Sequence, residues 1–498
     1  MTDAPVGRYV VSTGLGPVTL ASDEELVSIE QSPVSLPEHR EPPLSVLLRM
    51  ASAGSEAELG RHGPVIASLA NKENSANPEF RRYEAVYGRD ALYTAAFLRR
   101  LYPQLEDGTI RYFAAFQADH SDPLSLAAPG KIAHHIRDPR DPIARQLTAE
   151  TGRRWPWYGG TDTTVLFLIA GAHVAARNPG LPDEPVIYPA GHPRAGMPAH
   201  RNGAPLTIRD VIREAANWLR RALDQRPLPG LLWCWLNRKD SYTTWTDSPN
   251  AFHFGDGRIP PPPVAPTQLQ AEVYDAVTGV AALAANDPAL RLDPDAFTWL
   301  ATRVRKLILD HAVADHRLGP YLAAGLVVGR DGRPRALDVR TVGMGMTLDS
   351  QLLDCPAAGG LRESVVSHLA SPEMTSPFGL VGRARDEVRF TPFDYHSQVW
   401  AFATHRTALG LRRSGHTALA SKLSAAIIEQ ARDGLLPENV GAGVEDDLRY
   451  CPYVLTVRRP APDGRKTVTV KERPPAPYAA WTAGAVIATL AAEPQTTG

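Results

Sequence analysis

The chain contains helical segments of two kinds, and this difference constrains its fold more than any other feature. Segments 207–224 and 294–311 place apolar residues on one face at helical spacing and charged residues on the other. Segments 165–176 and 273–285 are apolar on nearly every side. A helix that is apolar all round must be buried all round. The alternation of the two kinds predicts inner helices enclosed by outer helices, in two concentric layers.

Local signals mark where several of these helices begin. Thr207 with Asp210 three residues later is typical of an N-cap, and Asp293 followed by Pro294 marks a second helix start. We expect roughly ten to twelve helices in all. The main expected segments are 89–102, 161–176, 207–224, 268–285, 294–311, 396–412, 417–431 and 478–490.

The N-terminal residues have a different character from the rest of the chain. Strand-forming residues at 8–12 and 18–20 flank a turn at Gly14–Pro17, which predicts a small hairpin. We therefore expect a small β-containing segment over residues 1–45 and one helical domain over residues 46–498. Long loops rich in Pro, Gly and aromatic residues connect the helices, and such loops are often functional. They span 152–160, 226–266, 371–395 and 437–477.

Composition excludes several classes of partner. The chain has 53 Lys and Arg against 54 Asp and Glu, so it lacks the basic excess that nucleic acid binding requires. No apolar run reaches the roughly 18 residues of a membrane helix, and the N-terminus does not resemble a signal peptide. The three cysteines, Cys234, Cys355 and Cys451, are too scattered for a disulfide framework or a zinc site. We expect a cytoplasmic protein without metal or cofactor.

The loop 226–266 interleaves aromatic residues with carboxylates. Trp233, Trp235, Tyr242 and Trp245 precede Asp247 in this loop. Aromatic faces cover the C–H patches of a sugar ring, and carboxylates bind its hydroxyls. An Asp beside an apolar ring also has its pKa raised by desolvation, as a general acid requires. A Trp-rich core loop with capping Asp residues explains the same pattern, so this loop alone leaves both interpretations open.

Two other segments place polar residues at helix starts. The segment YGRDALYTAAFL carries Arg89 and Asp90 at the start of a helix, where the pair could clamp vicinal hydroxyls. The segment WPWYGGTDTTVLFLIAG places Trp157, Tyr158 and Asp162 just before an apolar inner helix, so these residues are candidates to bind substrate. Ordinary N-capping explains the two Asp residues equally well.

The C-terminal third supplies the remaining candidates. His396 and Trp400 lie where a loop is expected to meet a helix, and Glu438 follows Pro437 in a later loop. A rigid Pro–Glu suits a base that must hold a water molecule in place. An ordinary surface Glu is the alternative.

Six segments, taken together and in order, resemble the motifs of the six-hairpin glycosidases. This superfamily includes glucoamylases, trehalases, the glucosidase half of glycogen debranching enzymes, α-glucosidase I and mannosylglycerate hydrolases, and the sequence is most similar to the debranching group. The resemblance covers residues from about 83 to about 490. The segments are YGRDALYTAAFL, WYGGTDTTVLFL, TTWTDSPNAF, YHSQVWAFATHRTALGLRRSGH, LLPENVGAG and APYAAWTAGAVIATL.

The resemblance implies an all-α fold, an (α/α)6 barrel with its active site in the mouth. Asp247 matches the general acid and Glu438 the general base of an inverting hydrolase, whose carboxylates stand about 6.5–9.5 Å apart. Arg89, Asp90 and Asp162 match positions that line the sugar subsite. The expected wall residues are Trp245, Gln270, Trp400 and Trp481.

The sequence departs from the family in three places. The segment QLQA has Gln268 and Ala271 where the family has Glu and Gly, and YHSQVW lacks the Arg–Gly before Ser. The large N-terminal β-sandwich of the family is absent or reduced to the first 45 residues. These changes indicate a small or unusual glycoside as substrate rather than a polymer.

We therefore predict an inverting glycoside hydrolase that acts on a terminal α-linked sugar, with α-glucosidase activity as the first choice. The partner is a carbohydrate or small glycoside, and the sequence does not define an oligomeric state. A glycoside phosphorylase is one alternative, and a sugar-binding or biosynthetic protein without turnover on the same barrel is another. Barrels of the terpene-cyclase and lanthionine-cyclase types lack support, because neither a DxDD-like motif nor a Cys/His zinc site is present.

Overall fold

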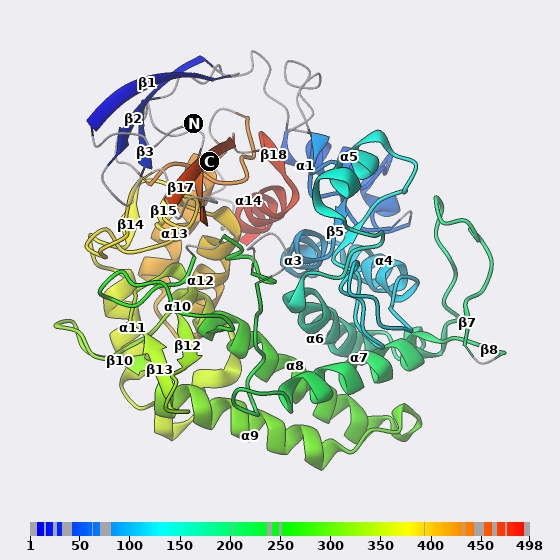
Figure 1. Ribbon diagram of the computed structural model, residues 1–498. Helices are drawn as coiled ribbons and strands as arrows, with labels where there is room; N and C mark the ends of the chain where they lie inside the picture. The colour runs from blue at the N-terminus through cyan, green and yellow to red at the C-terminus, as the bar shows by residue number, and fades with distance from the viewer. Residues whose placement is uncertain are drawn as a thin grey trace, which may run out of the picture.

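Thirteen helices dominate the computed structural model (Figure 1), which describes residues 7–13, 16–22, 27–31, 42–61, 63–69, 81–201, 203–236, 242–248, 251–392, 394–431, 434–442, 453–460, 466–473 and 476–492. No helix within these ranges is both long and apolar enough to cross a membrane. The helices are α1 (Pro43–Met50), α3 (Gly88–Leu98), α4 (Pro103–Ala114), α5 (Pro142–Thr151), α6 (Thr161–Arg177), α7 (Ile208–Leu223), α8 (Thr267–Asn286), α9 (Pro294–His311), α10 (Val342–Met346), α11 (Leu361–Leu369), α12 (Ala401–Arg413), α13 (Thr417–Gln430) and α14 (Ala480–Ala492).

Six of the helices contact one another in a closed ring. Helix α3 contacts α6, α6 contacts α8, α8 contacts α10, α10 contacts α12, α12 contacts α14, and α14 contacts α3 again. Their labels surround the middle of the molecule in Figure 1. Helices α6 and α8 are buried over most of their length, as expected for the segments 165–176 and 273–285, which are apolar on nearly every side.

A second set of helices packs outside this ring. Helix α4 contacts α3 and α6, α7 contacts α6, α9 contacts α8, α11 contacts α10, α13 contacts α12 and α14, and α1 contacts α14. Helix α7 shows how the sequence specifies an outer helix. The Thr207 side chain accepts a hydrogen bond from the backbone N–H of Asp210, and the two residues form the predicted capping box. Its buried face includes Val211, Ile212 and Ala215.

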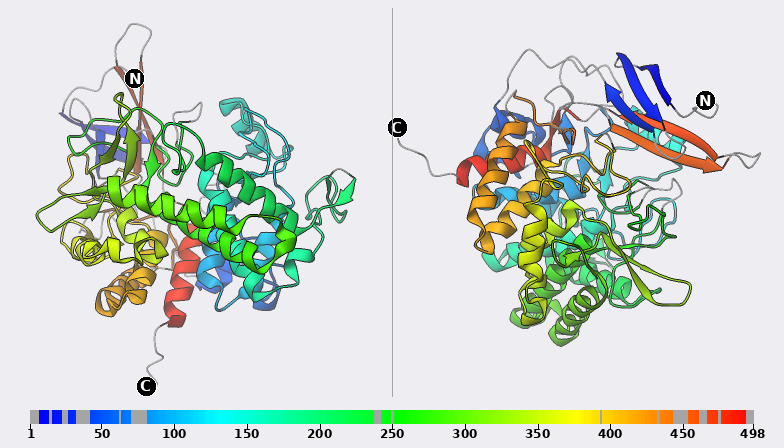
Figure 2. Two further views of the ribbon diagram at one scale, coloured as in Figure 1. Left: turned by 90° about the horizontal axis from the view of Figure 1, so that it is seen from below. Right: turned by 90° about the vertical axis from the view of Figure 1, so that its left-hand side faces the viewer.

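Small antiparallel sheets lie at the edges of the helical part. Strands β1 (Gly7–Thr13) and β2 (Gly16–Ser22) form the predicted hairpin, and β3 (Val27–Gln31) adds a third strand that was not predicted. The expected loop 437–477 contains a hairpin of β16 (Tyr453–Pro460) and β17 (Lys466–Arg473). Strand β16 contacts β3, and Figure 2 shows the two sheets side by side.

The remaining strands are short pairs within the loops, and most hold two residues. They are β4 (Ser68–Leu69), β5 (Val86–Tyr87), β6 (His135–Ile136), β7 (His200–Arg201), β8 (Ala204–Pro205), β9 (Ala265–Pro266), β10 (Val313–Ala314), β11 (Tyr321–Leu322), β12 (Gly325–Val328), β13 (Pro334–Leu337), β14 (Thr375–Ser376), β15 (Gly379–Leu380) and β18 (Tyr478–Ala479).

One predicted helix begins later than expected. The sequence indicated a helix over 396–412, but α12 begins at Ala401. The residues before it are extended because their backbone bonds with other loops: Val399 exchanges hydrogen bonds with Val440, and Gly382 N–H donates to the carbonyls of Ser397 and Gln398. His396 and Trp400 therefore lie on an extended segment in front of the helix.

Candidate active site

The inner helices begin at one end of the ring and end at the other. At their beginnings, Arg89 of α3 meets Asp162 of α6, with 2.7 Å between Nε and Oδ2 and 3.2 Å between Nη2 and Oδ1. Trp400, which precedes α12, lies 5.7 Å between ring centroids from Trp481 of α14. This end of the ring therefore collects the residues predicted to bind substrate.

The Arg89–Asp162 pair is buried, with 8% and 2% of the two residues exposed. Burial disfavours the charged form of Arg89, but the Asp162 carboxylate more than compensates, so the pKa of Arg89 lies above its usual value. Burial raises the pKa of the neighbouring Asp90 to about 7, although Arg89 opposes this shift. A fixed guanidinium–carboxylate fork next to a carboxyl group of this kind can donate to and accept from sugar hydroxyls.

The charges of Asp247 and Glu438 both act on the hydroxyl of Tyr395. Burial raises the pKa of the Tyr395 hydroxyl, and the charges of Asp247 and Glu438 raise it further. Both carboxylates therefore act on the same phenol, although they come from distant segments of the chain. Glu438 is 8% exposed and accepts a hydrogen bond at Oε2 from Ala476 N–H at 3.3 Å. Asp247 is also among the charges that raise the pKa of Arg89, after Asp162 and Asp90.

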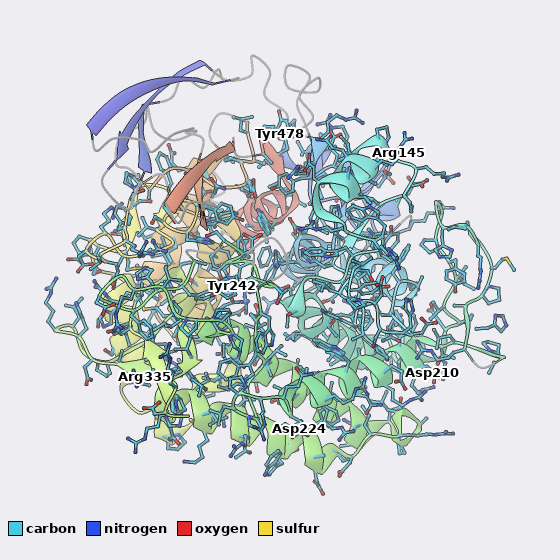
Figure 3. All side chains as sticks on the ribbon, in the orientation of Figure 1. Arg145, Asp210, Asp224, Tyr242, Arg335 and Tyr478 are labelled. Carbon is cyan, nitrogen blue, oxygen red and sulfur yellow. The ribbon has the colours of Figure 1, made fainter. Side chains whose placement is uncertain are left out.

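The backbone of Asp247 is held by its own loop. The carbonyl of Asp247 accepts a hydrogen bond from Tyr242 N–H at 2.9 Å, and Tyr242 is labelled near the middle of the ring in Figure 3. The Tyr242 ring meets Phe252 edge-on at 5.0 Å. The neighbouring Ser248 Oγ lies 2.6 Å from Nε2 of His396. The loop therefore contacts both the aromatic core and the segment in front of α12.

Four aromatic side chains pack together beneath this end of the ring. Trp245 lies 5.9 Å from Trp400 and 5.3 Å from Phe402, and Phe402 stacks on Trp481 at 4.5 Å. Trp400 is 1% exposed, and its indole N–H donates to the Tyr395 carbonyl at 3.2 Å. Trp400 therefore supports Tyr395 from below rather than forming an open wall. Trp245 and Trp481, each 5% exposed, lie in the same cluster.

Two of the predicted site residues, Gln270 and Tyr158, make hydrogen bonds to the backbone of other segments. Gln270 is fully buried, and its amide accepts from Leu232 N–H and donates to the Leu232 carbonyl, both at 2.9 Å. It holds the backbone before the aromatic loop, so its prediction as a wall residue was wrong. Gln268 contacts the cluster instead, because it accepts from the Trp245 indole N–H at 2.9 Å. The Tyr158 hydroxyl is similarly occupied by the Phe116 carbonyl at 3.1 Å.

Two residues near the site were not singled out from the sequence. Tyr395 is one, although it stands in the quoted YHSQVW segment. Arg153 is the other: its guanidinium carbon lies 3.8 Å from the centroid of a Trp157 ring. Burial lowers the pKa of Arg153, and Asp247 is among the charges that act on it. The guanidinium has no ion pair or hydrogen bond with any described residue, and its place in a Gly- and Trp-rich loop was the only signal in the sequence.

A chain of buried polar groups leads from this site along the axis of the ring. Gln268 Nε2 donates to the Tyr93 hydroxyl at 3.4 Å, and Tyr93 donates to Glu272. Arg406 pairs with Glu272 and lies 3.3 Å from Asp349. Burial raises the pKa of Glu272, and Arg406 opposes this shift. The chain links the aromatic cluster to the opposite end of the ring.

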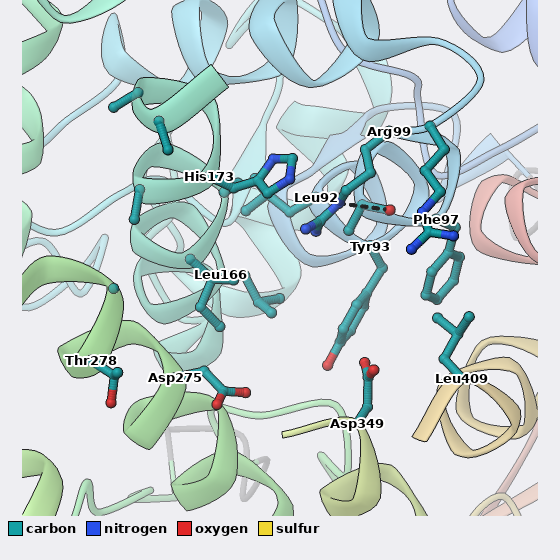
Figure 4. A pocket seen from close by; sticks show the side chains of 18 of the residues that line it. Leu92, Tyr93, Phe97, Arg99, Leu166, His173, Asp275, Thr278, Asp349 and Leu409 are labelled. Atoms are coloured by element: carbon teal, nitrogen blue, oxygen red, sulfur yellow. Dashed lines mark hydrogen bonds between the residues drawn. The ribbon is translucent and has the colours of Figure 1, made fainter. Parts of the chain in front are cut away.

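A cavity of about 1630 Å³ lies at that opposite end, between the final turns of α3, α6, α8, α12 and α14. Figure 4 shows its lining: Leu92, Tyr93, Phe97, Arg99, Leu166, His173, Asp275, Thr278, Asp349 and Leu409. Burial raises the pKa of Asp275 to about 7. The described lining lacks the paired tryptophans of the other end, so we place the candidate active site at the beginnings of the inner helices.

The fold is similar to that of solved glycosidases. A GH63 mannosylglycerate hydrolase from Thermus thermophilus, in complex with Tris and D-glycerate, aligns over 91% of this chain and 100% of its own, with a TM-score of 0.52 and 12% identity. A structure described as a wild-type glycosidase aligns over 92% and 98% of the two chains, with a TM-score of 0.50 and 17% identity. At such identities the likeness concerns the fold alone. No protein-family model and no curated protein matches the chain.

Proposed function

We propose that this protein is an inverting glycoside hydrolase on an (α/α)6 barrel, with residues 46–498 as the catalytic domain and residues 1–45 as a small β-containing addition. One observation carries the proposal: the charges of Asp247 and Glu438 both raise the pKa of the Tyr395 hydroxyl, and Arg89, which forms a buried pair with Asp162, lowers it. The fold shared with solved glycosidases supports it.

In this proposal the two carboxylates divide the chemistry. Asp247 donates a proton to the glycosidic oxygen as the bond to the anomeric carbon breaks. Glu438 takes a proton from a water molecule that attacks this carbon from the opposite face. Inversion requires a separation of about 6.5–9.5 Å between the two carboxyl groups, so that the water fits between them. Arg89, Asp90 and Asp162 hold hydroxyls of the sugar.

A terminal α-glucoside is the first substrate that we propose. The lone guanidinium of Arg153 favours a second candidate within the same reaction. Asp247, which would protonate the leaving group, is among the charges that act on Arg153. We therefore propose that Arg153 faces the leaving group and binds a carboxylate on it. A small acidic glycoside, such as the mannosylglycerate that gives the similar GH63 hydrolase its name, therefore belongs in the substrate panel.

The decisive experiment measures sugar release from maltose, isomaltose, trehalose, glycosylglycerol and glycosylglycerate, with the anomer of the product followed by NMR. We expect the wild type to release the β-anomer from an α-glycoside. Glu438→Gln and Asp247→Asn should both abolish release. On a substrate whose leaving group is not a sugar, such as glycosylglycerol, release of the α-anomer would contradict inversion. Release unchanged in both variants would contradict the proposed acid and base.

Added phosphate separates hydrolysis from phosphorolysis. A phosphorylase transfers the sugar to phosphate and needs no base carboxylate, so it would produce sugar phosphate and tolerate Glu438→Gln. We expect phosphate to leave both the products and the rate unchanged. Sugar binding without turnover, equal in wild type and variants, would favour the non-catalytic alternative.

A further inference from the structure

A buried cluster of basic side chains adjoins the loop that carries Asp247. Arg383, His253 and His396 are 2%, 1% and 4% exposed. Among the described residues, no hydrogen-bond partner exists for Nε and Nη2 of Arg383, Nε2 of His253 or Nδ1 of His396. Burial lowers the pKa of both histidines, and the charge of Arg383 lowers it further in each case. The three side chains therefore lie close together.

The partners of Arg383 do not fully compensate its positive charge. Arg383 Nη1 donates to the Arg389 carbonyl at 2.6 Å. The nearest carboxylate oxygen is Oδ1 of Asp394 at 3.9 Å, which exceeds hydrogen-bond distance. That oxygen already accepts from His396 N–H at 2.8 Å. Burial also raises the pKa of Asp394, which weakens it as a counter-charge.

A small cavity adjoins this cluster. It has a volume of about 30 Å³, and its lining includes Arg383, His396, Trp245, Thr246 and Gly382. This volume admits one water molecule or a monatomic ion of similar size, but not a carboxylate or phosphate. The loop residues Trp245 and Thr246 connect the cavity directly to Asp247.

We propose that this cavity binds a chloride ion, held by the free N–H groups of Arg383 and by Nδ1–H of His396. The Ser248 hydroxyl, 2.6 Å from Nε2 of His396, donates to this nitrogen and thereby leaves the ring proton on Nδ1. A monatomic anion suits these donors, because it accepts hydrogen bonds from all of them and has no proton of its own to place. The ion links Arg383 to Ser248 and so stabilises the loop of Asp247. The inference does not depend on the proposed hydrolase activity.

Thermal unfolding in two salts tests the site. We expect the Tm of the wild type to rise saturably with sodium chloride, by about 2 to 4 °C, relative to sodium gluconate at equal ionic strength. Bromide should replace chloride. Arg383→Gln should lose the increase, whereas Arg385→Gln should keep it, since Arg385 donates to the carbonyls of Pro372 and Thr375 and does not line the cavity.

Two measurements on the wild type alone decide the question if Arg383→Gln does not fold. Crystals soaked in bromide should show an anomalous peak in the cavity between Arg383 and His396, and the ³⁵Cl NMR line should broaden on addition of protein. Equal melting curves in chloride and gluconate, together with no bromide peak, would mean that the cavity holds only water and would overturn the proposal.

Discussion

The two ends of the inner ring differ in chemistry although the same helices build both. The beginnings of α3, α6, α12 and α14 bring together Arg89, Asp162, Trp400 and Trp481. The later turns surround a cavity of about 1630 Å³, whose lining includes aliphatic residues, several arginines, Asp275 and Asp349. The size of a cavity therefore does not identify the site in this molecule. Carboxylates that gather beside aromatic rings are a stronger indicator of an active site than cavity size, since carboxylates can transfer protons.

The largest contrast should appear in catalysis. Glu438→Gln or Asp247→Asn removes a group that exchanges a proton in the transition state, so kcat should fall by about 10³-fold or more. Asp349→Asn at the opposite end should leave kcat nearly unchanged. Initial rates on the best substrate of the panel measure both effects. A comparable loss in Asp349→Asn would break the distinction between the two ends.

The polar chain between the two ends should be costly to interrupt. Arg406→Met leaves Glu272 buried without its cation, so the free energy of unfolding should fall by about 3–5 kcal/mol. The double variant Arg406→Met/Glu272→Gln should recover part of this loss, because the unpaired charge is gone. Urea unfolding of the wild type, Arg406→Met, Glu272→Gln and the double variant gives the coupling energy. Equal stability of the single and double variants would show that the ion pair contributes little.

Arg153 tests specificity at the candidate active site. Arg153→Gln should raise KM for a glycoside with a carboxylate on its leaving group by about tenfold, and leave KM for the corresponding carboxamide unchanged. Arg154→Gln is the matched control, because the Arg154 side chain is 65% exposed and lies 3.8 Å from Asp122. An equal effect of Arg153→Gln on both substrates would indicate a purely structural role for this residue.

The smallest expected effect is a pH dependence of stability that comes from Asp275, in the cavity at the opposite end of the ring. The pKa of Asp275 is about 7 in the folded protein and about 3.9 when unfolded, so the unfolded chain loses this proton first as pH rises. The contribution of protonated Asp275 to the stability of the folded protein is complete below pH ~4 and is lost as pH rises to about 7. Asp275→Asn should therefore gain stability over the wild type across this range, by roughly 1–2 kcal/mol after allowance for partial exposure. A constant difference from pH 4 to 8 would contradict the shifted pKa.

Much of the helical architecture could be predicted from local pattern. Helix α9 spans Pro294–His311 as expected, because Asp293 caps it, Pro294 suits its first position and its apolar stripe continues to Ile308. Helices α4 and α5 were missed, although each begins with Pro in the first turn. The β16–β17 hairpin was also missed, because its residues were assigned to a loop rich in Pro and Gly.

The site could be predicted only in part. The motif residues Arg89 and Asp162 form a buried ion pair that the sequence did not predict. Gln268 contacts the aromatic cluster, whereas Gln270, the predicted wall residue, binds the backbone of Leu232. Two positions apart on a helix means a rotation of about 200°, so the two side chains face opposite directions. The sequence pattern contained both residues, but it did not define which face of α8 met the aromatic cluster.

The sequence by itself determined which helices are buried on all sides, where several of them begin, and which residue types gather in each loop. These properties depend on spacing and capping along a few turns of chain. Tertiary structure alone decided that the charges of Asp247 and Glu438 both act on Tyr395 and that Arg153 stacks on Trp157. It also decided that Nε and Nη2 of Arg383 have no hydrogen-bond partner among the described residues. These contacts join residues far apart in the chain, and closure of the helical ring determines their geometry.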